Sequence, residues 1–218
     1  MQFCLNTIVI KPENNLPINS AVILLHGYGG DGKDISSLVL NWRRFLPNTV
    51  FLCPDAHERC SISPSGFQWF DLTSNDKSHI LKESNKSEKK IISFINEVKK
   101  NFYLKSSKIC LSGFSQGCMM SINLGLTSEE NYACIVGFSG KIIDKEDLLK
   151  RKKSNPKFFF THGELDEVVS PTSLLETKDF LTRNNIYVQT NMIKGCGHHI
   201  SVEASSLALN FIKENLVK

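Results

Sequence analysis

The chain has 218 residues, of which 41% are hydrophobic and 22% are charged, and its formal net charge at pH 7 is +4. This composition is typical of a globular protein with a sizeable core, and the mild charge argues against a nucleic-acid partner. Because no long linker separates two parts, residues 1–218 are expected to form one domain.

Short apolar runs rich in β-branched residues alternate with amphipathic patterns along the whole chain. The expected strands span residues 7–10, 21–25, 50–53, 109–111, 134–138, 158–161 and 188–193. Several of these runs are apolar throughout, as expected where helices cover both faces of a sheet. The alternation predicts a mainly parallel α/β sheet with functional residues at the carboxyl ends of its strands.

Two helical patterns carry further detail. In the first, four apolar residues share one face: Ile91, Ile95, Val98 and Phe102. Asn85 and Glu88 predict a capping box at the start of this helix. The last helix is expected to open after Ser201 and to place four apolar residues on one side: Val202, Leu209, Ile212 and Leu216.

The cysteines and the first residues bear on location. No basic segment followed by a long apolar stretch opens the chain, and no apolar run is long enough to span a membrane. The seven cysteines are odd in number and scattered, which is typical of reduced, buried thiols. We therefore expect a cytoplasmic protein without stable membrane insertion. Without a CxxC pair, no metal site is expected.

Residues 113–117 read Gly-Phe-Ser-Gln-Gly and lie between an apolar run and a helix with almost no polar side. A nucleophile elbow requires this arrangement, with Ser115 in a strained turn and very small residues two positions before and after it. A serine hydroxyl is a weak nucleophile, so it needs a base and an acid that orients the base. Ser115 is the predicted nucleophile.

The base and the acid are expected to follow Ser115 in the order acid, then base. That order excludes the early histidines and favours His198, in the loop after residues 188–193. Its neighbour His199 stays an alternative, because one sequence does not settle this register. His162 precedes the acid candidates and is interpreted as an anchor of its turn.

Three carboxylates compete for the role of the acid in the loop after residues 158–161. Asp166 is preferred, because Val168 and Val169 follow it and would return it towards the strand end. Glu164 and Glu167 are interpreted as solvated loop charges.

The loop after residues 21–25 has two interpretations. Gly27-x-Gly29-x-x-Gly32 matches a dinucleotide fingerprint, and Asp55 lies where a ribose-binding acid would follow. The same glycines also suit a turn that directs a backbone N–H at a developing oxyanion. An NAD(P)-binding oxidoreductase is therefore an alternative, but it leaves the serine, acid and base unexplained.

The oxyanion donors are expected to be two backbone N–H groups. One belongs to Tyr28 in the glycine-rich loop, and the other belongs to Gln116, at a helix N-terminus whose dipole favours negative charge.

Together these motifs resemble the phospholipase/carboxylesterase family of α/β hydrolases, which includes acyl-protein thioesterases. The resemblance runs nearly end to end, and compact bacterial members look closest. The matching segments are residues 25–32, 53–56, 68–72, 113–117, 162–166 and 197–198.

The resemblance implies an α/β-hydrolase fold, with helices on both faces of a mainly parallel sheet and no large lid domain. It implies that Ser115, Asp166 and His198 are catalytic and that Tyr28 and Gln116 supply the oxyanion N–H groups. It also implies a substrate region at two aromatic residues, with no metal and no cofactor. These residues are Trp69 and Phe70.

The expected function is a serine carboxylic-ester hydrolase that forms an acyl-enzyme, with lysophospholipase or acyl-protein thioesterase as narrower options. A small ester or thioester is the expected partner, and a weak homodimer is left open. Cys118 and Glu164 depart from common family residues and leave substrate preference open.

The irregular segment 57–67 is expected to cover an acyl pocket. The basic run from Lys150 to Lys153 is interpreted as a solvated helix end, with an anionic docking patch as the alternative. A catalytically inactive binding module is a further alternative, although no triad member is missing.

Overall fold

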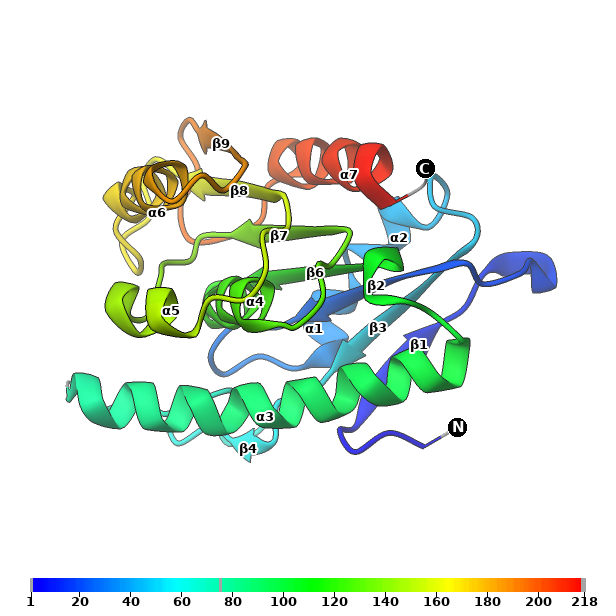
Figure 1. Ribbon diagram of the computed structural model, residues 1–218, viewed down its shortest axis with the longest axis horizontal. Helices are drawn as coiled ribbons and strands as arrows, with labels where there is room; N and C mark the ends of the chain where they lie inside the picture. The colour runs from blue at the N-terminus through cyan, green and yellow to red at the C-terminus, as the bar shows by residue number, and fades with distance from the viewer. Residues whose placement is uncertain (1, 75, 217–218) are drawn as a thin grey trace.

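A seven-stranded sheet crosses the molecule in the computed structural model, which describes residues 2–74 and 76–216 (Figure 1). Its strand order is β1-β3-β2-β6-β7-β8-β9, and only the β1–β3 pair of this sheet is antiparallel. The strands are β1 (Thr7–Ile10), β2 (Ser20–Leu25), β3 (Thr49–Pro54), β6 (Ile109–Phe114), β7 (Cys134–Phe138), β8 (Phe158–Gly163) and β9 (Val188–Ile193). The prediction of a mainly parallel α/β sheet is confirmed.

A separate hairpin pairs β4 (Glu58–Arg59) with β5 (Phe67–Gln68) in antiparallel register. It occupies most of the segment that the sequence predicts to be irregular. Two single 3₁₀ turns also lie between strands, at Glu13–Asn15 and Ser106–Lys108.

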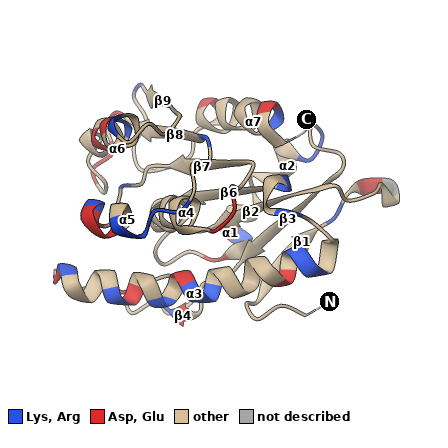
Figure 2. Ribbon diagram, viewed as in Figure 1, with Lys and Arg blue, Asp and Glu red and all other residues tan. Residues whose placement is uncertain are grey.

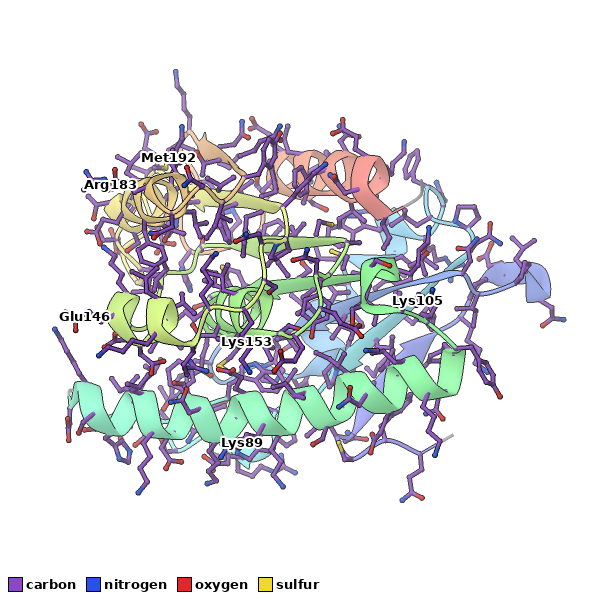
Figure 3. The ribbon with its side chains drawn as sticks, in the orientation of Figure 1. Lys89, Lys105, Glu146, Lys153, Arg183 and Met192 are labelled. Atoms are coloured by element: carbon purple, nitrogen blue, oxygen red, sulfur yellow. The ribbon has the colours of Figure 1, made fainter. Side chains whose placement is uncertain are left out.

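Helices cover both faces of the sheet, and in Figure 1 α3 and α7 run along opposite sides of the molecule. One face carries α3 (Lys77–Phe102), α4 (Gln116–Thr127), α5 (Lys145–Arg151) and α6 (Thr172–Arg183). The other face carries α1 (Gly32–Ser36), α2 (Val39–Trp42) and α7 (Val202–Leu216). Figure 3 shows side chains filling the space between α3 and the sheet, while Lys89 lies on the outer side of α3.

Strand β2 shows why the central runs are apolar at every position. Ala21, Ile23 and Leu25 point into the core on the α3–α4 side, and Val22 and Leu24 point into the core on the α7 side. All five are fully buried. Successive side chains alternate between the faces of a strand, so a strand covered on both faces needs no polar position.

One helix prediction is wrong. α3 begins at Lys77, where the Asp76 side chain accepts a hydrogen bond from Ser78 N at 2.9 Å, so the predicted capping box lies inside the helix. Near this start Ile80 packs on the core, and tertiary contacts of this kind support the polar first turns of α3. Glu88 lies further along and forms an ion pair with Arg151 of α5 at 2.9 Å.

A second helix prediction holds in part. α7 begins at Val202 as predicted, and Leu209, Ile212 and Leu216 are buried on one side. Val202 itself is 80% exposed.

Lysine, arginine, aspartate and glutamate lie mainly on the helices and loops, and the central strands β2, β6, β7 and β8 contain none of them (Figure 2). Part of the basic run at the end of α5 is paired. Arg151 binds Glu88 and Asp147, and Lys153 binds Glu129 at 2.5 Å. The run is therefore not a uniformly solvated helix end, because its charges tie α5 to α3 and to the end of α4.

Candidate active site

Ser115 lies in a strained turn between β6 and α4. Its φ is 51° and its ψ is −114°, a conformation that is costly for a residue with a side chain. A Cβ on Gly113 would lie 2.2 Å from backbone atoms of Gly117, and one on Gly117 would lie 2.1 Å from Leu25 O. The two glycines of the serine turn (residues 113–117) are thus required by close backbone packing.

His198 approaches Ser115 from the histidine loop (residues 194–201), which joins β9 to α7. Its Nε2 lies 3.0 Å from Ser115 Oγ, and its ring packs on Phe114 with a centroid distance of 4.8 Å. His199, the alternative base, faces Cys196 instead, with Nε2 3.6 Å from Sγ. The structure therefore brings His198, and not its neighbour, to the serine.

Asp166 is the carboxylate that meets His198. Its Oδ2 lies 2.7 Å from His198 Nδ1, and its Oδ1 accepts N–H bonds from Val168 and Val169, both at 2.9 Å. Burial opposes ionisation of Asp166, but the bonds from His198, Val169 and Val168 outweigh it, so its pKa lies below the ordinary value. Glu164 is exposed and accepts a bond from Gly195 N at 3.1 Å. Glu167 is also exposed.

His162 lies beneath Asp166 and is 1% exposed. Its Nε2 is 2.8 Å from Val169 O and 3.3 Å from Asp166 Oδ2. It anchors the turn, as the sequence predicts. It also lies next to the Asp166 carboxylate, and this contact was not predicted from the sequence. The sequence does contain a signal for this contact, because His162 and Asp166 are four residues apart across a tight turn at the end of a strand.

Tyr28 and Gln116 bring two backbone segments to the serine. Gln116 is the first residue of α4, and the first N–H groups of a helix have no acceptor within it. Tyr28 belongs to the glycine loop (residues 26–32), which follows β2. A Cβ on Gly27 would lie 3.4 Å from Ser115 Cβ, so the glycine loop lies beside the serine.

The Gln116 side chain ties the serine turn to the chain after β5. Its Oε1 accepts a bond from Trp69 N at 2.8 Å, and its Nε2 donates to Phe70 O at 2.7 Å. The Trp69 indole in turn donates to His26 O at 2.9 Å. These bonds connect the start of α4 to the glycine loop through groups that are almost wholly buried.

Trp69 and Phe70 are each 1% exposed, so neither ring forms an open wall. Trp69 packs on His26 with a ring-centroid distance of 5.2 Å, and its N–H is used by the glycine loop. The expected substrate contact at Trp69 is therefore corrected to a supporting one, since a buried indole needs an internal acceptor. Phe70 does border a hollow.

The hairpin β4–β5 covers the glycine loop rather than the hollow beside Phe70. Gly29 N donates to Phe67 O and Phe67 N donates to Gly30 O, both at 2.9 Å. A Cβ on Gly66 would lie 1.9 Å from Gly29 O. The expectation that residues 57–67 cover an acyl pocket is therefore wrong: their backbone pairs with the glycine loop.

Asp55 holds the glycine loop from below. Its Oδ1 accepts a bond from Gly32 N at 2.8 Å, and its Oδ2 accepts one from Asn6 Nδ2 at 2.6 Å. A Cβ on Gly32 would lie 2.2 Å from Cys53 O. Asp55 and Gly32 of the dinucleotide-like motif are thus used in internal contacts. These contacts argue against the oxidoreductase interpretation.

One hollow borders the serine turn at Phe114, and a second borders Met119 in the first turn of α4. The His198 hollow, about 330 Å³, is bordered by Leu38, Phe114, His198 and Ile200 among others. The Phe70 hollow, about 500 Å³, is bordered by Phe70, Leu72, Met119, Ile142 and Ile143 among others. Met119 N donates to Ser115 O, so the second hollow begins one helical turn beyond the serine.

Within residues 2–74 and 76–216, no three His, Cys, Asp or Glu side chains are grouped as metal ligands. None of the helices in those ranges combines the length and apolarity that a membrane crossing needs. Cys118 lies close behind Ser115, but burial raises its pKa to about 12, so its thiol stays protonated.

A serine in a strained turn after a central parallel strand, with histidine and aspartate on later strand-end loops, defines the α/β-hydrolase class of fold. The model of the Phospholipase/Carboxylesterase family matches residues 6–216. The chain belongs to this family, and it is an enzyme of the serine ester- and thioester-hydrolase type.

Individual relatives agree with this assignment. The acyl-protein thioesterase 1 of Neurospora crassa is 27% identical over 215 residues, which cover 91% of this chain and 88% of that protein. That of Emericella nidulans is 30% identical over 170 residues, or 69% of this chain and 70% of that protein. The crystal structure of esterase PE8 has a TM-score of 0.92 and 31% identity, covering 97% of this chain and 99% of that one.

The expected closer likeness to bacterial members is not borne out. The curated relatives described above are fungal acyl-protein thioesterases. The His-Gly-x-Gly-x-Asp-Gly string suggested the bacterial group, but the packing of the glycine loop explains that string without reference to any one group.

Proposed function

We propose that this protein is a serine carboxylesterase in which Ser115, His198 and Asp166 form a catalytic triad. The observation that carries the proposal is the chain of two hydrogen bonds, 3.0 Å from Ser115 Oγ to His198 Nε2 and 2.7 Å from His198 Nδ1 to Asp166 Oδ2. Both distances lie in the range in which a base can take the serine proton while a carboxylate holds its tautomer.

In the proposed reaction Ser115 Oγ attacks the acyl carbon while His198 Nε2 takes its proton. Asp166 stabilises the imidazolium that forms, and its lowered pKa keeps it ionised for this role. The backbone N–H groups of Tyr28 and Gln116 then stabilise the oxyanion of the tetrahedral intermediate. His198 gives the proton to the leaving alcohol or thiol, and water repeats the sequence on the acyl-enzyme.

The Gln116 side chain and Trp69 act in this proposal as positioning groups. An oxyanion donor works only if it already points at the developing charge. The Gln116 side chain accepts a bond from Trp69 N and donates one to Phe70 O, and the Trp69 indole donates to His26 O. These bonds connect the two segments that carry the oxyanion donors. We infer that they fix the distance between the Tyr28 and Gln116 N–H groups.

The acyl group is assigned to the Phe70 hollow. Its apolar border suits a hydrocarbon chain, and its volume of about 500 Å³ lies within the roughly 300–1,000 Å³ of small-molecule pockets. Lys77 and Lys141 also border it, so the end of a longer chain would meet solvent and charge. Short- to medium-chain esters and thioesters are the proposed substrates, the thioesters in keeping with the names of the fungal relatives.

A cytoplasmic location remains a prediction, which the cysteines support. All seven are free, although Cys110 and Cys134 lie opposite each other on neighbouring strands. Burial raises the pKa of Cys110 well above its ordinary value, as expected for an unreactive core thiol. A weak homodimer also stays a prediction.

Activity-based labelling tests the proposal directly. A fluorophosphonate probe is expected to label the wild-type protein at Ser115, and Ser115→Ala is expected to lose both this label and turnover of p-nitrophenyl butyrate. Ser121→Ala is the matched control, since Ser121 is buried in the same helix and donates only to Gly117 O. Labelling that persists in Ser115→Ala would exclude Ser115 as the nucleophile.

A further inference from the structure

The His198 hollow opens between the glycine loop, helix α1 and the histidine loop. Four apolar side chains form much of its border: Ile35, Leu38, Phe114 and Ile200. Phe114 directly precedes Ser115, and its ring packs on His198 with a centroid distance of 4.8 Å. The hollow therefore borders the imidazole and the residue directly before the serine.

The direction of proton transfer assigns the two sides of a bound ester. His198 Nε2 must reach the leaving oxygen or sulfur to protonate it, so that atom lies on the imidazole side of the tetrahedral carbon. His198 borders the His198 hollow and not the Phe70 hollow. The group attached to the leaving atom is therefore assigned to the His198 hollow, which Tyr28 of the glycine loop also borders.

We propose that the His198 hollow is the leaving-group subsite and that it selects compact, apolar alcohols or thiols without negative charge. This inference rests on the proposed esterase function. The hollow's volume of about 330 Å³ lies at the lower end of the range for small-molecule pockets. A benzyl or butyl group would contact its apolar border, whereas methyl would leave that border solvated.

The charges around the hollow oppose an anionic leaving group. Asp34 contributes an exposed carboxylate to the border. His26 offers no compensating charge, because burial lowers its pKa and its Nε2 accepts a bond from Ala56 N at 3.0 Å. His199 faces Cys196 from the outer end of the hollow. Among the described residues that border the hollow there is no lysine or arginine.

A leaving-group series at constant acyl group measures this selectivity. Methyl, butyl and benzyl butyrate all form the same butyryl-enzyme, so differences in kcat/KM report formation of the acyl-enzyme alone. Benzyl butyrate is expected to exceed methyl butyrate by about tenfold, the scale for filling an apolar pocket. Monobutyrylglycerol is expected to exceed its phosphate ester by about fivefold, the scale for an exposed like-charge contact.

Matched tryptophan variants locate the selectivity. Leu38 and Ile143 are both partly buried and border different hollows. Leu38→Trp, which fills the His198 hollow, is expected to reduce the benzyl-to-methyl ratio about tenfold, towards unity. Ile143→Trp is expected to keep that ratio and to lower the hexanoate-to-acetate ratio instead. Leu38→Ala, which enlarges the hollow, tests the same assignment without added bulk and is expected to favour naphthylmethyl over benzyl butyrate.

Charge selectivity has its own variant. Asp34→Asn is expected to reduce the preference for monobutyrylglycerol over its phosphate ester about fivefold, and to leave the benzyl-to-methyl ratio high. An unchanged preference would overturn the role assigned to Asp34.

The outcomes separate the two levels of the proposal. A wild-type protein that hydrolyses none of these esters would overturn the proposed function and this inference with it. Turnover with the same benzyl-to-methyl ratio in wild type and in both Leu38 variants would overturn the leaving-group subsite alone. A change in acyl-length preference in Leu38→Trp, without a change in leaving-group preference, would assign the His198 hollow to the acyl chain.

Discussion

The serine turn and the histidine loop meet at one hydrogen bond, yet the space around their glycines differs. In the serine turn, a Cβ on Gly113 or Gly117 would lie within 2.2 Å of backbone atoms. In the histidine loop, a Cβ on Gly195 would have nothing within 4 Å, and one on Gly197 would have nothing nearer than 3.8 Å. The histidine loop is packed closely on its inner side, where a Cβ on Gly163 would lie 2.3 Å from Gly197 O, but it is open beside Gly195.

This difference suits what each group does in the proposed reaction. The serine must stay at one point, facing two backbone N–H groups. The imidazole must first take a proton from Ser115 and then turn it towards the leaving atom, and the open space beside Gly195 permits that adjustment. Asp166 and Phe114 limit the motion, since one binds His198 Nδ1 and the other packs on its ring.

The largest expected effect comes from removing the contact that orients the base. Asp166→Asn keeps the shape of the side chain but takes away the charge that holds the His198 tautomer. We expect kcat for p-nitrophenyl butyrate to fall on the order of 10⁴-fold. Glu167→Gln is the matched control on the same loop, and near-normal kcat in Asp166→Asn would move the acid role to another carboxylate. Circular dichroism checks that the fold is retained.

A paired glycine substitution tests the difference in backbone packing. Gly117→Ala places a methyl 2.1 Å from Leu25 O, and we expect it to lower the free energy of unfolding by about 3 kcal/mol or more. Gly195→Ala meets no atom but has a φ of 62°, so we expect a loss of only about 1–2 kcal/mol. Urea denaturation measures both, and equal losses would contradict the contrast between the two regions.

The Gln116 side chain tests whether side-chain contacts also matter in the serine turn. Gln116→Ala leaves Trp69 N and Phe70 O without their buried partner, and we expect a loss of about 1–3 kcal/mol in the free energy of unfolding. If the amide positions the oxyanion donors, kcat falls at least tenfold while KM changes little. Glu164→Gln, an exposed position in the loop after β8, is expected to change either quantity little. An unchanged kcat in Gln116→Ala would limit the side chain to stability.

The smallest expected effect is a pH dependence of stability beside the serine turn. Burial holds the pKa of His26 below the ordinary value of 6.5, so the unfolded chain binds a proton more readily than the folded protein. Between the lowered pKa and 6.5, the free energy of unfolding therefore falls as the pH falls. Urea denaturation of His26→Gln is expected to show a shallower slope in this window. An unchanged slope in His26→Gln would contradict this contribution of His26.

Much of this site could be predicted from residue order, because its chemistry depends on the ends of parallel strands. Ser115, Asp166 and His198 follow β6, β8 and β9, and the parallel sheet brings those ends to one edge. The prediction for Trp69 is wrong because the sequence pattern is the same for an aromatic residue that lines a pocket and for one that packs behind it. Only its 1% exposure and its bond to His26 O distinguish the two roles.

The helices show the same limit. The start of α3 has no apolar periodicity, so the sequence predicts its beginning nine residues too late, at a false capping box. Tertiary packing extends the helix towards its start, where Ile80 packs on the core. Conversely, Val202 fits the apolar face of α7 by spacing but is 80% exposed, whereas Ala204 and Ser205 of the same turn are buried.

The sequence by itself determined the parallel sheet, the order of serine, acid and base, and the need for glycine at positions 113 and 117. These properties follow from local periodicity and from steric rules that act over a few residues. Only the tertiary structure distinguished His198 from His199 as the histidine beside Ser115. It also showed that Asp55 binds the dinucleotide-like glycine loop and that two separate hollows lie near the site. Those outcomes depend on distances between segments far apart in the chain, which no local pattern encodes.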